Sequence, residues 1–192
     1  MTTGGTTFMF MAGSTSRRDA ALARTSVKLH IIGIPSAGKT TLATQLSARL
    51  GTPYFVLDGL AFVDERWTLR SASERDEMLA EILERPAFIT EGGFLDWTRD
   101  LFAAADVIIW LDPPLPTLVW RHVLRFRRHP WSLPSLLLFQ VRSYVRPEGA
   151  GPFKGDPNQT RSGIATALKP WRDKVLRVHR NVSADEIVAY LG

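Results

Sequence analysis

Eight consecutive residues carry the pattern G-x-x-x-x-G-K-T, and this pattern constrains the fold more than any other feature of the chain. An apolar run (27–34) leads into it, and residues 39–50 repeat apolar side chains at helical spacing. The segment is therefore expected to be a strand, a glycine-rich loop and a helix. Backbone N–H groups of such a loop converge on phosphate oxygens, and the helix N-terminus favours the anion. The sequence thus predicts a phosphate-binding loop, formed by Gly33, Ile34, Pro35, Ser36, Ala37, Gly38, Lys39 and Thr40.

Three side chains at the start of the helix have expected roles in this loop. Lys39 is expected to reach the β- and γ-phosphates of a nucleotide, and the Thr40 hydroxyl is expected to ligate Mg²⁺. Thr41 supplies a second hydroxyl beside it. A glycine-rich turn with an incidental lysine is the alternative, but the strand before the motif and the helix after it favour phosphate binding.

The composition limits the other classes of protein. The chain has 192 residues, 45% hydrophobic and 22% charged, which is typical of one soluble globular domain. It has no cysteine, so disulfides and thiolate metal sites are excluded, and no two of its four histidines stand at the spacing of a helical ligand pair. No apolar run approaches the roughly 18 residues of a membrane span. Residues 1–26 are expected to be a flexible arm without a signal peptide, and we expect a cytoplasmic protein.

Short apolar runs alternate with helical patterns along the rest of the chain. Ser71 and Glu74 fit a capping box, and Ser183 fits a helix cap. This alternation predicts an α/β three-layer sandwich with a five-stranded, mainly parallel sheet. Strands are expected at 27–34, 54–57, 87–90, 107–111 and 175–179, and helices at 39–50, 71–85, 94–105, 115–128, 133–146, 161–171 and 184–191.

The charge is concentrated in one part of the chain. Residues 113–180 contain 13 Lys and Arg but three Asp and Glu, a net charge of +10, whereas residues 1–112 have a net charge of −3. A segment this basic favours an anionic partner. Nucleotide phosphates, nucleic acid and an anionic membrane surface all qualify, and a solvated basic face is the structural alternative.

Three further segments carry a family resemblance. They are L-D-G-L-A-F at 57–62 followed by Trp67, F-I-T-E-G-G-F at 88–94, and V-I-I-W-L-D-P at 107–113. With the phosphate loop, they resemble the small P-loop kinases of the adenylate kinase and shikimate kinase type over residues 27–192. Within these kinases, the segments are most similar to the adenylate-kinase-like group known as DNA topology modulation proteins.

The resemblance implies an acceptor site at the ends of two strands. Asp58 would orient or deprotonate an acceptor hydroxyl, although an aspartate before Gly-Leu also suits a helix N-cap. Glu91 would lie near Mg²⁺ and the acceptor, and Gly92 and Gly93 would let an acceptor approach the backbone, unless they form only a strand-to-helix turn. Adenylate kinases continue with Pro and Arg where this chain has Phe94 and Leu95, which argues against AMP as the acceptor.

The resemblance also implies a basic helical lid, over about 121–160. Asp112 ends an apolar strand and would hold Mg²⁺ or its waters. Arg121 and Arg125 follow it by nine and thirteen residues, share one helix face, and would stabilise charge on the transferred group. Two weaker nucleotide contacts are also expected. Arg128 follows Arg121 and Arg125 in the lid, and Asn181 follows the fifth strand.

These features together predict a phosphotransferase that uses ATP and Mg²⁺ and transfers the γ-phosphoryl group to a small acceptor. One alternative is a nucleotide-binding regulator with a DNA-linked role and little turnover. Another is a kinase that acts on a nucleic-acid 5′-hydroxyl, using the basic 113–180 segment. The chain has no Asn-Lys-x-Asp segment for reading guanine, which argues against a GTPase. The sequence does not specify the acceptor or the oligomeric state.

Overall fold

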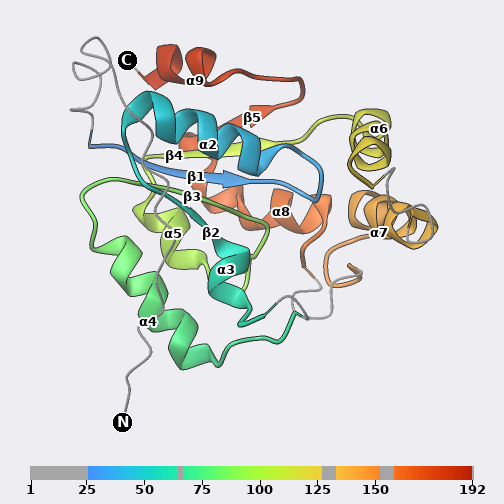
Figure 1. Ribbon diagram of the computed structural model, residues 1–192, viewed down its shortest axis with the longest axis horizontal. Coiled ribbons are helices and arrows are strands. Elements are labelled where there is room, and N and C mark those ends of the chain that lie inside the picture. Colours follow the sequence, from blue (N-terminus) through green and yellow to red (C-terminus); the bar gives the residue numbers. More distant parts are fainter. Residues whose placement is uncertain (1–25, 65–66, 127–132, 152–157, 192) are drawn as a thin grey trace.

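The apolar runs of the sequence form a five-stranded parallel sheet in the computed structural model, which describes residues 26–64, 67–126, 133–151 and 158–191 (Figure 1). The strand order is β2-β3-β1-β4-β5, and each neighbouring pair is parallel. The fold class predicted from the sequence is therefore confirmed. The strands are β1 (Lys28–Ile32), β2 (Tyr54–Val56), β3 (Phe88–Gly92), β4 (Val107–Leu111) and β5 (Val175–Val178).

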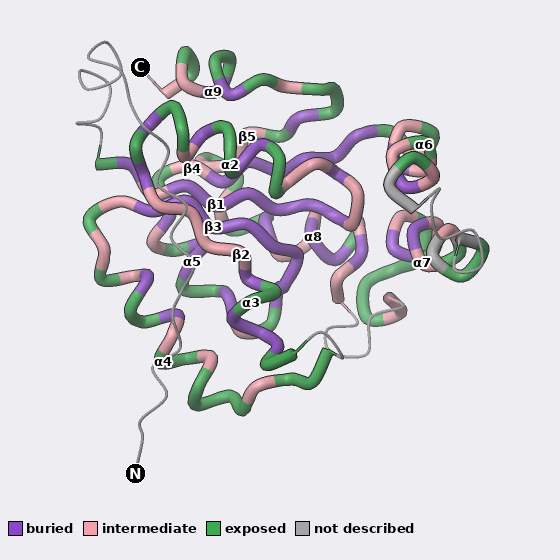
Figure 2. Tube along the Cα trace, viewed as in Figure 1, coloured by how far each residue is buried: buried purple, intermediate pink, exposed green. Residues whose placement is uncertain are grey.

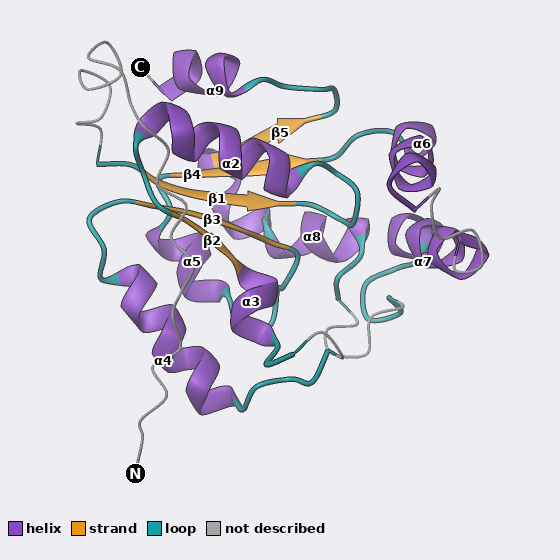
Figure 3. Ribbon diagram, in the orientation of Figure 1, coloured by secondary structure: helices purple, strands orange, loops and turns teal. Residues whose placement is uncertain are grey.

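Helices cover both faces of this sheet (Figure 3). The chain steps from β1 to β2 in one direction across the sheet and from β2 onward in the other. Right-handed crossovers therefore place α2 on one face and α4, α5 and α8 on the opposite face. Helix α9 follows the last strand and packs against α2, so it lies on the face of α2. The helices are α2 (Lys39–Leu50), α3 (Leu57–Ala61), α4 (Ala72–Leu83), α5 (Arg99–Ala104), α6 (Leu115–Phe126), α7 (Leu133–Val145), α8 (Arg161–Ala167), the 3-10 helix η2 (Lys169–Lys174) and α9 (Ala184–Leu191).

The central strands form the core of the molecule (Figure 2). All five residues of β3 are buried, and so are the last four of β1 and of β4. Strands buried on both faces need continuous apolar runs, as in I-I of β1 and V-I-I-W-L of β4. Because all strands are parallel, their carboxyl ends meet at one edge, where the phosphate loop and helices α6 and α7 lie (Figure 1).

Several predicted boundaries were wrong. The helix expected at 94–105 begins only at Arg99, and residues 93–95 continue beyond β3 without helical structure. The helix expected at 161–171 ends at Ala167 and is followed by η2, which has Pro170 in its first turn. The sequence patterns also missed the five-residue helix α3. The capping box of Ser71 and Glu74 is confirmed at the start of α4.

The predicted basic lid contains α6 and α7, which pack against each other at the rim of the molecule (Figure 1). Residues 1–25 of the predicted N-terminal arm lie outside the described residues. In the part of the chain that the structure describes, no helix combines the length and the hydropathy that crossing a bilayer requires.

Candidate active site

The phosphate loop connects β1 to α2 and is held close to β4. A Cβ atom on Gly33 would lie 2.6 Å from the carbonyl oxygen of Leu111, so only glycine fits where the loop begins. Gly38 adopts the left-handed conformation (φ 101°) immediately before α2. The Lys39 ammonium donates to the carbonyl oxygen of Ile34 at 3.3 Å, so this side chain folds back over the loop. The predicted loop residues therefore form a turn that ends at a helix N-terminus.

Thr40 and Glu91 are brought together at the carboxyl edge of the sheet. Strand β3 pairs with β1, and the register that places Glu91 opposite Ile31 brings its carboxylate next to the start of α2. The Thr40 hydroxyl donates to Glu91 Oε1 at 2.7 Å, and Glu91 is only 3% exposed. A hydroxyl and a carboxylate are both oxygen ligands of the kind that Mg²⁺ prefers. Thr41 lies beside them as an exposed residue of α2.

Asp112 has different partners from those predicted. Its carboxylate, 2% exposed, accepts hydrogen bonds from Arg161 Nε at 2.6 Å and from Arg177 Nη2 at 2.5 Å. The hydrogen bond from Arg161 to Asp112 is the main reason that the pKa of Arg161 is raised. Two guanidinium groups thus neutralise the carboxylate that was expected to hold Mg²⁺, and we leave Asp112 out of the proposed metal site. Among the described residues, no group of three or more Asp, Glu or His side chains is arranged to hold a metal ion.

Helix α6 contacts the phosphate loop through two consecutive residues. Arg121 Nη1 donates to the Ala37 carbonyl oxygen at 2.7 Å, and Nη2 donates to the Asn181 side chain. His122 is buried, and its Nδ1 lies 3.0 Å from the hydroxyl of Ser36, which has a positive φ of 61°. Arg121 and Asn181, which are 60 residues apart in the sequence, are therefore brought together at the loop.

The remaining predicted arginines are placed less fully. Arg125 lies on α6 one turn after Arg121, as expected, but its side chain is outside the described part of the structure. Arg128 lies outside the described residues altogether.

The structure shows the surroundings of Asp58 and of the two glycines on the predicted acceptor side. Helix α3 begins at Leu57 with Val56 as its N-cap, so the N-cap alternative for Asp58 is wrong, and this residue lies exposed in the first turn. A Cβ atom on Gly92 would lie 2.7 Å from Leu57 Cβ, and one on Gly93 would lie 3.1 Å from Gln159. Both glycines thus lie close to side chains of the chain itself, and the approach of an acceptor to their backbone stays a prediction.

Sequence reasoning missed three residues of this region, Arg161, Arg177 and His122. Arg161 follows the α8 N-cap Thr160, and Arg177 alternates with Val178 on β5, so each occupies a position where an exposed arginine is ordinary. Only His122 carried a signal, because it directly follows Arg121 at the start of the predicted lid.

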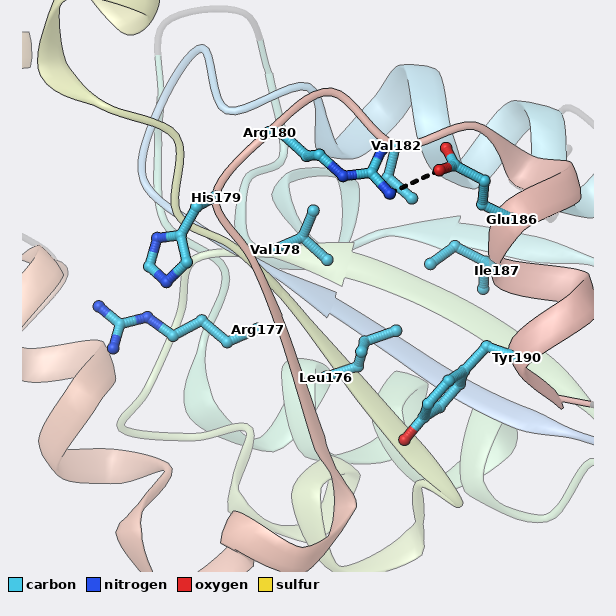
Figure 4. Close-up of a pocket in the computed structure, with 9 residues that line it drawn as sticks. All are labelled: Leu176, Arg177, Val178, His179, Arg180, Val182, Glu186, Ile187 and Tyr190. Carbon is cyan, nitrogen blue, oxygen red and sulfur yellow. Dashed lines mark hydrogen bonds and ion pairs between the residues drawn. The ribbon is translucent and has the colours of Figure 1, made fainter.

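A pocket of about 480 Å³ lies between β5 and α9 (Figure 4). Its lining combines apolar side chains such as Leu176 and Tyr190 with the ion pair of Arg180 and Glu186, 2.6 Å apart. The hydrogen bond from Arg180 lowers the pKa of Glu186 to about 2. None of the predicted site residues lines this pocket, so the phosphate loop remains the better candidate site.

Comparison with solved structures gives the fold a precedent. The chain is similar to a shikimate kinase from Acinetobacter baumannii in complex with shikimate, with 15% identity, a TM-score of 0.51, and coverage of 90% of this chain and 93% of the other. It also matches a gluconokinase from Sinorhizobium meliloti 1021 at 16% identity and a TM-score of 0.49, covering 86% and 89% of the two chains. No protein-family model matches the sequence, and no curated protein matches it. At this identity the similarity to the shikimate kinase shows the fold alone.

Proposed function

We propose that the chain is an ATP-dependent kinase that transfers the γ-phosphoryl group to a small acceptor. The observation that carries the proposal is the hydrogen bond between Thr40 and buried Glu91, at the end of a complete phosphate loop. This loop offers backbone N–H groups and a helix N-terminus to phosphate, and the Thr40–Glu91 pair offers oxygen ligands to the metal that accompanies a nucleotide. The fold shared with a solved shikimate kinase supports the same activity by analogy.

Positioning and charge neutralisation would supply most of the rate enhancement in such an enzyme. Lys39, which folds over the loop, would face the β- and γ-phosphates. Arg121 would contribute positive charge from α6, with Arg125 on the same helix face. Thr40 and Glu91 fit Mg²⁺, which when bound would neutralise phosphate charge.

The acceptor would approach from the side of α3. Asp58 is exposed in the first turn of this helix, next to the end of β3 where Glu91 lies, and a carboxylate there suits an acceptor hydroxyl. We propose the acceptor class as a small hydroxyl compound, nucleoside or nucleotide. We further propose a relationship to the DNA topology modulation proteins, which rests on the four sequence segments. We also propose that residues 27–192 form one domain with a lid at about 121–160.

The alternative functions depend on the basic segment. A net charge of +10 over residues 113–180 favours an anionic partner, and a nucleotide-dependent DNA-binding regulator or a 5′-hydroxyl nucleic-acid kinase would use it. These readings predict binding to an oligonucleotide with a steep salt dependence.

A panel of acceptors with γ-labelled ATP tests the proposal, from shikimate and sugar acids to nucleosides, nucleoside monophosphates and 5′-hydroxyl oligonucleotides. Once an acceptor is found, Glu91→Gln should lower Mg²⁺-dependent turnover by ~10²-fold, because the amide keeps the shape but loses the charge. Nucleotide binding without Mg²⁺ should change by less than about 3-fold.

Thr44→Ala is the matched control, since this threonine lies one turn further along α2, where its hydroxyl donates to the Thr40 carbonyl oxygen at 2.8 Å. Its turnover should stay close to that of the wild type. Labelled product from none of the acceptors, together with tight oligonucleotide binding, would favour the regulator.

A further inference from the structure

The outer faces of α6 and α7 expose apolar side chains that no other described element covers. On α6, Trp120 is 63% exposed and Leu124 is 42% exposed. On α7, Leu138 is 49% exposed and Val145 is 62% exposed. These are four of the eight large apolar side chains that are exposed in the described part of the chain. Trp120 and Leu124 are four residues apart, and Leu138 and Val145 are seven apart, so each pair follows helical spacing.

Helix geometry groups these residues on one side of each helix. Residues 116, 120 and 124 of α6 are exposed and are four apart, whereas Leu118 and His122 are buried on the opposite side. On α7, residues 134, 138 and 145 are exposed, and Gln140 and Ser143 are buried. Each helix thus packs one face inward. Outward, α6 presents Trp120 and Leu124, and α7 presents Leu138 and Val145 with Arg142 on the same face. We call the exposed set Trp120, Leu124, Leu138 and Val145 the outer stripe.

The outer stripe belongs to a basic segment of the chain. Residues 113–151 contain six arginines, no lysine and a single acidic residue, Glu148. Among the arginines with described side chains, Arg142 and Arg146 are exposed at the carboxyl end of α7. An amphipathic helix with a tryptophan, aliphatic residues and flanking cations is suited to the interface of a bilayer, where the ring and the aliphatic groups enter the acyl boundary and the cations meet anionic headgroups.

We propose that the outer stripe binds the surface of an anionic lipid bilayer, with α6 and α7 lying shallowly in the interface. The buried face of α6 holds His122 against Ser36 of the phosphate loop, so one helix would contact the bilayer on one side and the nucleotide site on the other. The proposal concerns a peripheral contact and needs no membrane-spanning helix.

Two other occupants fit the described surface less well. A second copy of the chain related by two-fold symmetry would bring the same arginines face to face, at an electrostatic cost. Nucleic acid would gain from the arginines, but Leu124, Leu138 and Val145 offer it no hydrogen bond, and Trp120 alone makes no stacking platform. Charge complementarity together with aliphatic exposure therefore favours a lipid surface.

Co-sedimentation of the full chain with vesicles tests the proposal. The protein should bind vesicles in which about a third of the lipid is phosphatidylglycerol, and should bind pure phosphatidylcholine weakly. Binding should weaken at about 0.5 M salt, where the electrostatic attraction is screened. The double variant Trp120→Gln/Leu138→Gln should bind at least ~10-fold more weakly, and Arg142→Glu about fivefold or more.

Trp67→Gln is the matched control, because this tryptophan is equally exposed (61%) in the segment that follows α3. It should bind the vesicles as the wild type does. Retained nucleotide binding by each variant would establish that the variant folds. Vesicle binding is measured without turnover, so its result does not decide whether the chain is a kinase.

Three results would overturn the proposal. Equal binding of the double variant and the wild type to anionic vesicles would remove the outer stripe from the contact. A wild-type dimer that the double variant abolishes, without vesicle binding, would assign the surface to a second copy. Binding of an oligonucleotide that the double variant weakens, again without vesicle binding, would assign it to nucleic acid.

Discussion

The ammonium group of Lys39 lies over the phosphate loop because it donates to the carbonyl oxygen of Ile34 at 3.3 Å. This contact holds the cation where the proposed nucleotide would place its phosphates. Lys39→Ala should lower turnover by ~10²-fold or more, since it removes a charge aimed at the transferred group. Its melting temperature should stay within a few degrees of the wild type, because one partly buried hydrogen bond contributes about 1 kcal/mol. Turnover equal to that of the wild type would contradict the proposed function.

His30 is a residue with a consequence for stability rather than for catalysis. It lies on β1 with no exposed surface, its Nδ1 is 2.9 Å from the Thr90 hydroxyl, and its ring packs 5.2 Å from that of Phe102. Burial, with a smaller effect from Lys39, lowers the pKa of His30 to about 3. In the unfolded chain His30 binds a proton near pH 6.5, whereas in the folded chain it stays neutral until the pH approaches 3. The unfolding free energy is therefore unaffected by His30 above pH 6.5 and falls as the pH drops from 6.5 towards 3.

Urea unfolding between pH 4 and pH 7 measures this effect. Through His30, the wild type should lose unfolding free energy steadily below pH 6.5, on the order of 1 kcal/mol per pH unit. His30→Phe should flatten that slope, although it gives up the hydrogen bond to Thr90 and should lower the stability at pH 7. Parallel pH profiles for the two proteins would show that His30 is not the group that titrates.

At the scale of elements, β3 and α3 approach each other too closely for a side chain at Gly92. A Cβ atom there would lie 2.7 Å from Leu57 Cβ and 2.8 Å from Leu57 Cδ1. Gly92→Ala should therefore lower the unfolding free energy by about 1–3 kcal/mol, because Leu57 is fully buried and has little room to shift. The same change should disturb Glu91, whose carboxylate precedes the glycine.

Gly59 is the matched control for this substitution, since a Cβ atom on it meets nothing within 4 Å and it lies in the middle of α3. Gly59→Ala should raise the unfolding free energy by about 0.5–1 kcal/mol through helix propensity. Thermal unfolding of the two variants would compare them directly, and a neutral Gly92→Ala would mean that α3 moves away without cost.

Local patterns predicted most of the elements but not α3 or the split after α8. A run of five residues that contains a glycine has too few turns for a helical period, so Leu57–Ala61 carried no periodic signal, and the cap signal at Asp58 pointed to the wrong start. The helix break at Leu168 follows from Pro170, which fits the first turn of a new helix but not the middle of an old one. Both errors arise where a single residue, rather than a period, decides the structure.

At the scale of the whole molecule, the sequence predicted which strand ends carry polar groups but not how those groups pair. The phosphate loop and Glu91 could be placed together because parallel strands end at one edge. The partners of Asp112 could not be predicted, because Arg161 and Arg177 follow it by 49 and 65 residues, and only the packing of α8 and β5 brings them near. The sequence pattern of an aspartate at the end of a strand does not distinguish a metal partner from an arginine partner.

The partners of Asp112 connect several parts of the molecule. Its backbone N–H donates to Val178 of β5 at 2.8 Å, and its carboxylate binds Arg161 of α8 and Arg177 of β5. The Arg161 guanidinium also lies 5.1 Å from the ring of Tyr144 on α7. One buried carboxylate therefore joins β4 to β5 and α8 and, through Arg161, to α7, so its removal should lower stability even without a ligand.

Asp112→Asn should lower the unfolding free energy by about 1–3 kcal/mol in EDTA. A fully buried ion pair would lose more. Here both arginine side chains are over one-third exposed, so water partly screens their charges. The amide keeps the shape of the carboxylate but leaves two cations facing a neutral group. Asp173→Asn is the control, because its pair with Arg172 is 3.6 Å long and exposed on both sides, and it should change stability by less than about 0.5 kcal/mol.

Urea unfolding with and without Mg²⁺ distinguishes the two roles of Asp112. A structural role predicts the same loss in both conditions, whereas unchanged stability in EDTA with lost Mg²⁺-dependent turnover would return Asp112 to the metal site.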